Sequence, residues 1–195
     1  MTPRRIAFLL FPRLTVLDLI GGYDALRRVS SMGIDPRVTC HMIGTESPVL
    51  DETGIRLVPD AVYDDLSSYD LLYVPGGPGT RSLATDARLT GYLRGWGTSR
   101  PLASVCTGAI LIGAAGHLEG LRATTHHTAF DELRPHCREV VTDRRIVDQG
   151  RVVTAAGVTS ALDLGLFLVE RFWGAEARGR IAAQMEYGSE SPGNG

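Results

Sequence analysis

The sequence has few cysteines, no long apolar run and almost no net charge. Its three cysteines, Cys40, Cys106 and Cys137, are too widely spaced to indicate a disulfide framework or a CxxC metal site. No run approaches the roughly 18 apolar residues of a membrane span, and the apolar stretch near the N-terminus is too short for the core of a signal peptide. A formal net charge of -2 gives no electrostatic reason to expect nucleic acid or an anionic membrane as a partner. We therefore expect a reduced protein of the cytoplasm.

Cofactor motifs are absent as well. The sequence contains no GxGxxG dinucleotide fingerprint and no phosphate loop, and no group of His, Cys and carboxylate residues has the spacing of metal ligands. We therefore expect no cofactor and no metal. The composition, 44% hydrophobic and 22% charged, is that of a globular domain, and no repeat or linker divides the chain. We expect one domain over residues 1–195, with a frayed tail at 189–195.

Short apolar runs typical of buried strands alternate with helical patterns along the chain. Strands are predicted at 6–11, 37–43, 70–74 and 102–105, with an extended run at 122–125 and a hairpin over 146–154. Helices are predicted at 16–29, 87–96, 107–115, 127–133, 160–172 and 175–185, while 54–62 is open between short strands and a hairpin. This alternation predicts an α/β fold, a doubly wound and mostly parallel sheet with helices on both faces.

In such a sheet the site lies beyond the carboxyl ends of the strands. Cys106 stands at one of these ends, where a strand becomes a helix among small residues such as Ser104 and Gly108. Small residues permit the tight turn of a nucleophile elbow, and the N-terminus of the following helix is expected to lower the pKa of the thiol. The residues alone leave two alternatives, a nucleophile and an inert core cysteine.

Two further strand ends carry candidates. The run Pro75-Gly-Gly-Pro-Gly79 leaves backbone N–H groups uncovered, which suits an oxyanion hole, although a plain turn has the same composition. Asp18 is a carboxylate in an apolar neighbourhood just past the first strand. Because burying it without compensation is costly, it either caps the helix that begins here or faces the cysteine, shares a proton with it and has a raised pKa.

Two adjacent histidines, His126 and His127, follow an extended run. A Cys–His pair would be an activated nucleophile, but the sequence does not show which ring, if either, reaches the thiol.

The sequence resembles the ThiJ/PfpI superfamily over nearly its whole length. The resemblance rests on six segments: Ile6-Ala-Phe-Leu-Leu-Phe-Pro12, Leu17-Asp-Leu19, Asp70-Leu-Leu-Tyr-Val-Pro-Gly-Gly77, Ser104-Val-Cys-Thr-Gly108, Gly113-Ala-Ala-Gly116 and Arg122-Ala-Thr-Thr-His126. It implies a flavodoxin-like three-layer sandwich, as in class I glutamine amidotransferases, and a homodimer. Within the superfamily the sequence is most similar to the isonitrile (isocyanide) hydratases, which combine an Asp after the first strand with an S-V-C-T-G elbow.

This resemblance implies roles for individual residues. Cys106 would be the nucleophile and Asp18 its acid–base partner, and the backbone N–H groups of Gly77 and Thr107 would stabilise developing negative charge. It also places Ile20, Gly76, His126 and His127 near the pocket wall.

The expected reaction is hydration of a small organic isocyanide to the N-formamide through a thioimidate on Cys106. Two alternatives remain. One is a glyoxalase- or deglycase-like thiol enzyme, a branch that usually carries Glu where this chain has Asp18. The other is a ligand-sensing domain related to those of AraC-type regulators, which binds without turnover.

Overall fold

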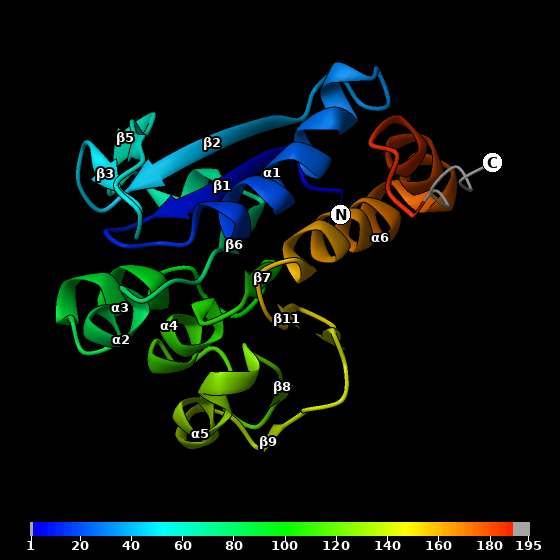
Figure 1. Cartoon of the computed structure of the whole chain (residues 1–195). Helices are drawn as coiled ribbons and strands as arrows, with labels where there is room; N and C mark the ends of the chain where they lie inside the picture. Colours follow the sequence, from blue (N-terminus) through cyan, green and yellow to red (C-terminus); the bar gives the residue numbers. More distant parts are fainter. Residues whose placement is uncertain (1, 189–195) are drawn as a thin grey trace.

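The centre of the protein is a seven-stranded sheet (Figure 1), seen in a computed structural model that describes residues 2–188. The strand order is β10-β11-β7-β6-β1-β2-β5. These strands are β1 (Arg5–Leu10), β2 (Thr39–Gly44), β5 (Ala61–Val62), β6 (Leu71–Val74), β7 (Leu102–Val105), β10 (Ile146–Gln149) and β11 (Val152–Ala155). Every neighbouring pair is parallel except the β10–β11 hairpin. The predicted mostly parallel sheet is confirmed, whereas the tail predicted at 189–195 lies outside the described residues.

The three central strands are buried along almost their whole length. In β1 every residue after Arg5 is buried, and all four residues of β6 and of β7 are buried. A strand can be apolar without alternation only where both faces of its sheet are covered. The continuous apolar runs of the sequence therefore require helices on both sides of the sheet.

Helices supply this cover in a three-layer arrangement (Figure 1). On one side α1 (Val16–Ser31) packs against α6 (Ser160–Gln184), and glycine allows the close approach: a Cβ added at Gly165 would lie 2.8 Å from the Cβ of Ala25. The other helices are α2 (Thr80–Leu83), α3 (Ala87–Arg94), α4 (Gly108–Ala114) and α5 (Phe130–Leu133). No helix within residues 2–188 is long and apolar enough to cross a membrane.

Most predicted elements are present, with shifted ends. Asp86 accepts hydrogen bonds from the N–H groups of Arg88 and Leu89, as expected of the residue that caps α3. The two predicted C-terminal helices are both present within α6, where Gly174, with φ 91° and ψ 166°, is non-helical and separates them. The open segment 54–62 contains β4 (Arg56–Leu57), which pairs with β3 (Val49–Leu50), and β5, which joins the main sheet.

The segment 122–140 forms a small lobe beyond α4. Its strands β8 (Arg122–Ala123) and β9 (Glu139–Val140) pair in parallel, and α5 lies beside them (Figure 1). The helix predicted at 127–133 is split into a 3₁₀ turn at His127–Ala129 and the short α5. The lobe brings His126 toward the carboxyl ends of the central strands.

Two helical glycines test how tightly α1 packs on the sheet. A Cβ at Gly22 would lie 2.4–2.5 Å from ring atoms of the buried Tyr73, whereas a Cβ at Gly91 of α3 meets nothing within 4 Å. We expect Gly22→Ala to lower the free energy of unfolding by about 1–3 kcal/mol through overpacking. The matched change Gly91→Ala should raise it by about 0.5–1 kcal/mol. Urea unfolding of both variants measures the difference, and equal effects would contradict this account of the α1–sheet contact.

Candidate active site

Cys106 lies on a sharp turn between β7 and α4. Its φ is 54°, a left-handed conformation that costs a residue with a side chain about 1–2 kcal/mol. The turn confirms the elbow predicted from the sequence. Strain of this kind persists only where surrounding contacts enforce it.

Those contacts come from three neighbouring segments. The N–H of Cys106 donates to the carbonyl oxygens of Ala155 and Ala156 at 3.1 and 2.9 Å, and its own carbonyl oxygen accepts the hydroxyl of Thr125 at 2.8 Å. After the turn, a Cβ at Gly108 would lie 2.4 Å from the carbonyl oxygen of Val74. The small residue at 108 is thus a steric requirement of the turn.

Asp18 is fully buried in the first turn of α1. The helix is preceded by Thr15, so Asp18 does not cap it and the capping alternative is wrong. Oδ2 of the carboxyl accepts the N–H of Gly76 at 3.1 Å, and the hydroxyl of Tyr73 donates to the Asp18 carbonyl oxygen at 2.9 Å. Oδ1 has no nitrogen or oxygen partner, and the thiol of Cys106 interacts with the carboxyl closely enough to lower its pKa. Tyr73, a positioning residue, was not identified from the sequence.

Gly76 permits the carboxyl and the thiol to meet. A Cβ at this position would lie 2.8 Å from Oδ2 of Asp18 and 2.8 Å from the Cβ of Cys106. Any side chain at Gly76 would therefore push the two groups apart. The ends of β6 and β7 and the first turn of α1 meet at this glycine.

Burial dominates the protonation of both groups. It raises the pKa of Asp18 from its usual 3.8 to about 7, against hydrogen bonds from the Cys106 thiol and the Gly76 N–H that lower it. Burial and the negative charge of Asp18 raise the pKa of Cys106 to about 12. The sequence predicted the raised pKa of the carboxyl, but the predicted lowering at the thiol is wrong. The backbone N–H of Thr107, at the start of α4, lowers the pKa of the thiol as expected, but burial has the larger effect.

The pair can therefore move a proton without a change of charge on the protein. The carboxyl titrates near neutral pH, and the thiol, whose pKa is about 12, keeps its proton there. A carboxyl with a pKa near the working pH can accept a proton in one step and return it in the next.

Two backbone N–H groups lie at the sulfur. Hydrogen bonds from the backbone of Thr107 and of Val158 lower the pKa of Cys106, against the larger effect of burial. The N–H of Gly77 instead donates to Oγ1 of Thr107 at 2.9 Å, so it is not free for a substrate, contrary to the prediction. Val158, in the loop before α6, was not identified because no sequence signal connects it with the elbow.

A cleft of about 320 Å³ opens over Cys106. His126 and Pro78 line it, together with Glu52 and Arg81, which the sequence analysis did not single out. Three predicted wall residues, Gly76, Ile20 and His127, are absent from the lining. Ile20 is 37% exposed on the surface of α1, and His127 lines a neighbouring pocket instead.

The histidines do not activate the thiol. Nδ1 of His126 contacts Oγ1 of Thr128 at 2.8 Å, and neither ring hydrogen bonds to Cys106. The partner of the thiol is thus a carboxyl. Within residues 2–188 no group of three His, Cys, Asp or Glu side chains is placed to hold a metal ion.

Comparison with known proteins agrees with this geometry. The profile of the DJ-1/PfpI family matches residues 4–171, and the chain belongs to that family. A crystal structure of a ThiJ/PfpI family protein from Pseudomonas syringae superposes with a TM-score of 0.84 and 29% identity, over 100% of this chain and 79% of that one. DJ-1beta of Drosophila melanogaster, at 20% identity over 95% of this chain and 98% of its own, has the same fold with a TM-score of 0.82.

Two curated relatives have different activities. The isonitrile hydratase of Pseudomonas putida is 35% identical over 96% of this chain and 80% of its own length. The HTH-type transcriptional regulator GbdR of Pseudomonas aeruginosa is 26% identical over 95% of this chain, which spans about half (51%) of that regulator. The family therefore includes both enzymes and regulators.

The raised pKa of Asp18 predicts a dependence of stability on pH. The folded carboxyl keeps its proton up to about pH 7, whereas the unfolded one loses it near 3.8, so stability falls as the pH rises between these values. We expect Asp18→Asn, which cannot ionise, to be more stable than the wild type by a few kcal/mol at pH 8, since one pKa unit corresponds to about 1.4 kcal/mol. The difference should disappear below pH 4. Urea unfolding across this range measures it, and two parallel stability curves would contradict the raised pKa.

Proposed function

We propose that this protein hydrates organic isocyanides, R–NC, to N-formamides, R–NH–CHO. The observation that carries the proposal is the buried Asp18–Cys106 pair, of which Cys106 lines an open cleft and Asp18 lies buried behind it with a pKa near 7. The similarity to the Pseudomonas putida isonitrile hydratase over nearly the whole chain supports it.

In the first half-reaction the thiol adds to the terminal carbon of the isocyanide. Sγ of Cys106 forms the C–S bond as its proton passes to Asp18, and Asp18 delivers a proton to the same carbon. The product is a thioimidate, R–N=CH–S–Cys106, and no leaving group departs. At the end of the step the Asp18 carboxyl has the same protonation state as at its start.

In the second half-reaction water replaces the sulfur. Asp18 takes a proton from water as its oxygen adds to the thioimidate carbon and passes that proton to the nitrogen, giving R–NH–CH(OH)–S–Cys106 and an ionised carboxyl. The C–S bond then breaks, the hydroxyl proton returns to sulfur through Asp18, and R–NH–CHO leaves. The N–H groups of Thr107 and Val158 stabilise negative charge on the sulfur as it departs.

The geometry favours this reaction over the glyoxalase-like alternative. Glyoxalase chemistry moves a proton between adjacent carbons, which needs a base that reaches beyond the sulfur. The short Asp18 side chain is held by Gly76 directly beside Cys106, and its place suits proton transfer to the atom bonded to sulfur. A ligand-sensing domain would not need a proton shuttle of this kind.

The proposal requires a reduced thiol, and it therefore places the protein in the cytoplasm, as the cysteine usage predicts. The thiols of Cys40, Cys106 and Cys137 are all free in the structure.

Replacement of the thiol provides the direct test. We expect the wild type to convert cyclohexyl isocyanide to N-cyclohexylformamide and Cys106→Ser to reduce kcat/KM by about a thousandfold or more, because the hydroxyl is a far weaker nucleophile. Formamide is measured by chromatography. Cys40→Ser, at a thiol near the start of β2 and so at the end of the strand away from the site, is the matched control and should retain full activity. A folded wild type that hydrates no isocyanide, or a fully active Cys106→Ser, would contradict the proposal.

The proposal also includes a homodimer. Large apolar side chains are exposed on α1 and on the segment 50–62, namely Leu17, Ile20, Leu50, Ile55, Val58 and Val62. Covering them with a second copy would remove apolar surface from water. We expect sedimentation analysis to show a dimer for the wild type and a folded monomer for Ile20→Glu. A monomeric wild type would contradict the dimer and leave the chemistry of Cys106 unaffected.

A further inference from the structure

The loop of residues 156–159, between β11 and α6, supplies two backbone contacts to Cys106. The carbonyl oxygen of Ala156 accepts the N–H of Cys106 at 2.9 Å, and a hydrogen bond from the backbone of Val158 lowers the pKa of the thiol. Val158 also lines the cleft. Whatever fixes this loop therefore fixes part of the surroundings of the sulfur.

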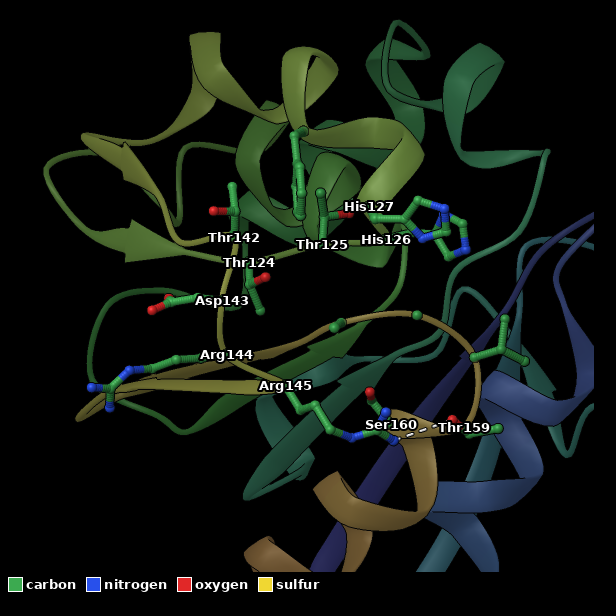
Figure 2. Close-up of a pocket in the computed structure, with 14 residues that line it drawn as sticks. Thr124, Thr125, His126, His127, Thr142, Asp143, Arg144, Arg145, Thr159 and Ser160 are labelled. Atoms are coloured by element: carbon green, nitrogen blue, oxygen red, sulfur yellow. Dashed lines mark hydrogen bonds between the residues drawn. The ribbon is translucent and has the colours of Figure 1, made fainter.

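Arg145, the residue before β10, holds the loop at both of its ends. Its carbonyl oxygen accepts the N–H of Ala156 at 2.8 Å, and Nη2 of its guanidinium donates to Oγ1 of Thr159 at 3.1 Å. Figure 2 shows the Arg145 side chain reaching the start of α6, where a dashed line marks the bond to Thr159. Val158 lies between these two fixed points of the chain.

A carboxylate fixes the side chain of this arginine. Nε of Arg145 donates to Oδ2 of Asp163 at 2.7 Å. Asp163 lies in the first turn of α6, and its other oxygen, Oδ1, accepts the hydroxyl of Tyr187. The two oxygens of one carboxylate thus join the residue before β10 to the turn that follows α6.

The contact between Tyr187 and Asp163 depends on the break in α6. A straight helix would separate residues 163 and 187 by about 36 Å, at a rise of about 1.5 Å per residue. The non-helical backbone of Gly174 lets the second half of α6 fold back. The N–H of Tyr187 then donates to the carbonyl oxygen of Ala182 at 2.9 Å, and Gln184 accepts a hydrogen bond from Arg28 of α1.

The exposure of these groups indicates what they contribute. The side chain of Arg145 is 58% exposed and that of Asp163 is 21% exposed. An ion pair with this much exposure adds little to stability, so substitutions that break it should leave the protein folded. None of Arg145, Asp163 and Tyr187 is among the residues that line the cleft over Cys106.

We propose that Arg145, Asp163 and Tyr187 are positioning residues of the active site, which hold the 156–159 loop where its backbone meets Cys106. The contacts run without a gap from the turn after α6, through one carboxylate and one guanidinium, to the loop and the thiol. The effect on turnover rests on the proposed function, whereas the effect on the thiol does not.

The hydroxyl of Thr159 provides the mildest test. Thr159→Val keeps the shape of the side chain and removes the acceptor of Arg145, whereas Thr159→Ser keeps it. The side chain of Thr159 is exposed and makes no capping hydrogen bond to α6, so both variants should fold. Because the Val158 contact favours the thiolate, we expect iodoacetamide to alkylate Cys106 about fivefold more slowly in Thr159→Val, the effect of one hydrogen bond. Thr159→Ser should react at the wild-type rate. Mass spectrometry of the Cys106 peptide measures both.

Tyr187→Phe tests the far end of the network. It removes only the hydroxyl that Asp163 accepts, and we expect it to slow alkylation of Cys106 about fivefold. The matched control is Tyr69→Phe, which removes a hydroxyl that donates to Oδ2 of Asp64 at 2.7 Å, just before β6 and away from the site. This control should leave the alkylation rate unchanged.

Arg145→Gln tests the middle of the network and should slow alkylation by at least as much. Its matched control is Arg171→Gln, which breaks an ion pair between α6 and Asp148, near the turn of the β10–β11 hairpin. Adding Tyr187→Phe to Arg145→Gln should have little further effect, because residues of one network are not additive. Additive effects of the two substitutions would contradict a single network.

Hydration assays separate this inference from the proposed function. With cyclohexyl isocyanide, Tyr187→Phe should lower kcat about fivefold and leave KM unchanged, because Tyr187 does not line the cleft. Slower alkylation of Cys106 in a protein that hydrates no isocyanide would support the positioning role and refute the proposed function. Hydration by the wild type, with alkylation and kcat unchanged in Tyr187→Phe and Arg145→Gln, would overturn the inference and leave the hydratase proposal standing. Faster alkylation would also overturn it, since that result indicates a generally loosened site.

Discussion

The buried contact between the carboxyl of Asp18 and the thiol of Cys106 is the interaction on which the rest of the site depends. The two groups come from segments far apart in the sequence, and Gly76 is the point where their backbones approach. The hydroxyl of Tyr73 holds the first turn of α1 by donating to the Asp18 carbonyl oxygen. The carbonyl oxygens of Ala155 and Ala156 hold the elbow by accepting the N–H of Cys106. Each of these contacts restricts the position of either the carboxyl or the thiol relative to the other.

Much of the fold follows from local patterns. Uninterrupted apolar runs predict strands that are buried on both faces, and the order of strands and helices then requires a mostly parallel sheet. The same argument locates the site, because β1, β6 and β7 are neighbours and their carboxyl ends meet. Asp18 was identifiable because burying a carboxylate without compensation is costly. Cys106 was a candidate because it lies at a strand end among small residues, which alone left an inert core cysteine as the alternative.

Other parts of the site depend on tertiary contacts that no local pattern encodes. Gly77 lies in a glycine-rich run of the kind that supplies oxyanion donors, but its N–H already donates to Oγ1 of Thr107. Val158 enters the site only because the loop before α6 folds over the elbow. His126 and His127 are adjacent in the chain, yet the first borders the thiol and the second does not. The pKa of Cys106 depends on opposing effects, and burial raises it by more than the backbone N–H groups of Thr107 and Val158 lower it.

The two carbonyl oxygens that hold the N–H of Cys106 belong to Ala155 and Ala156, at the end of the last strand of the sheet in chain order. During synthesis on the ribosome, β1, β6 and β7 emerge well before this strand. A nascent chain that has already formed its central strands therefore still has an elbow with no acceptor for that N–H, and its thiol lacks the backbone of Val158. The elbow at Cys106 is therefore completed by the last third of the chain, and its geometry can form only after residues 155–158 have been synthesised.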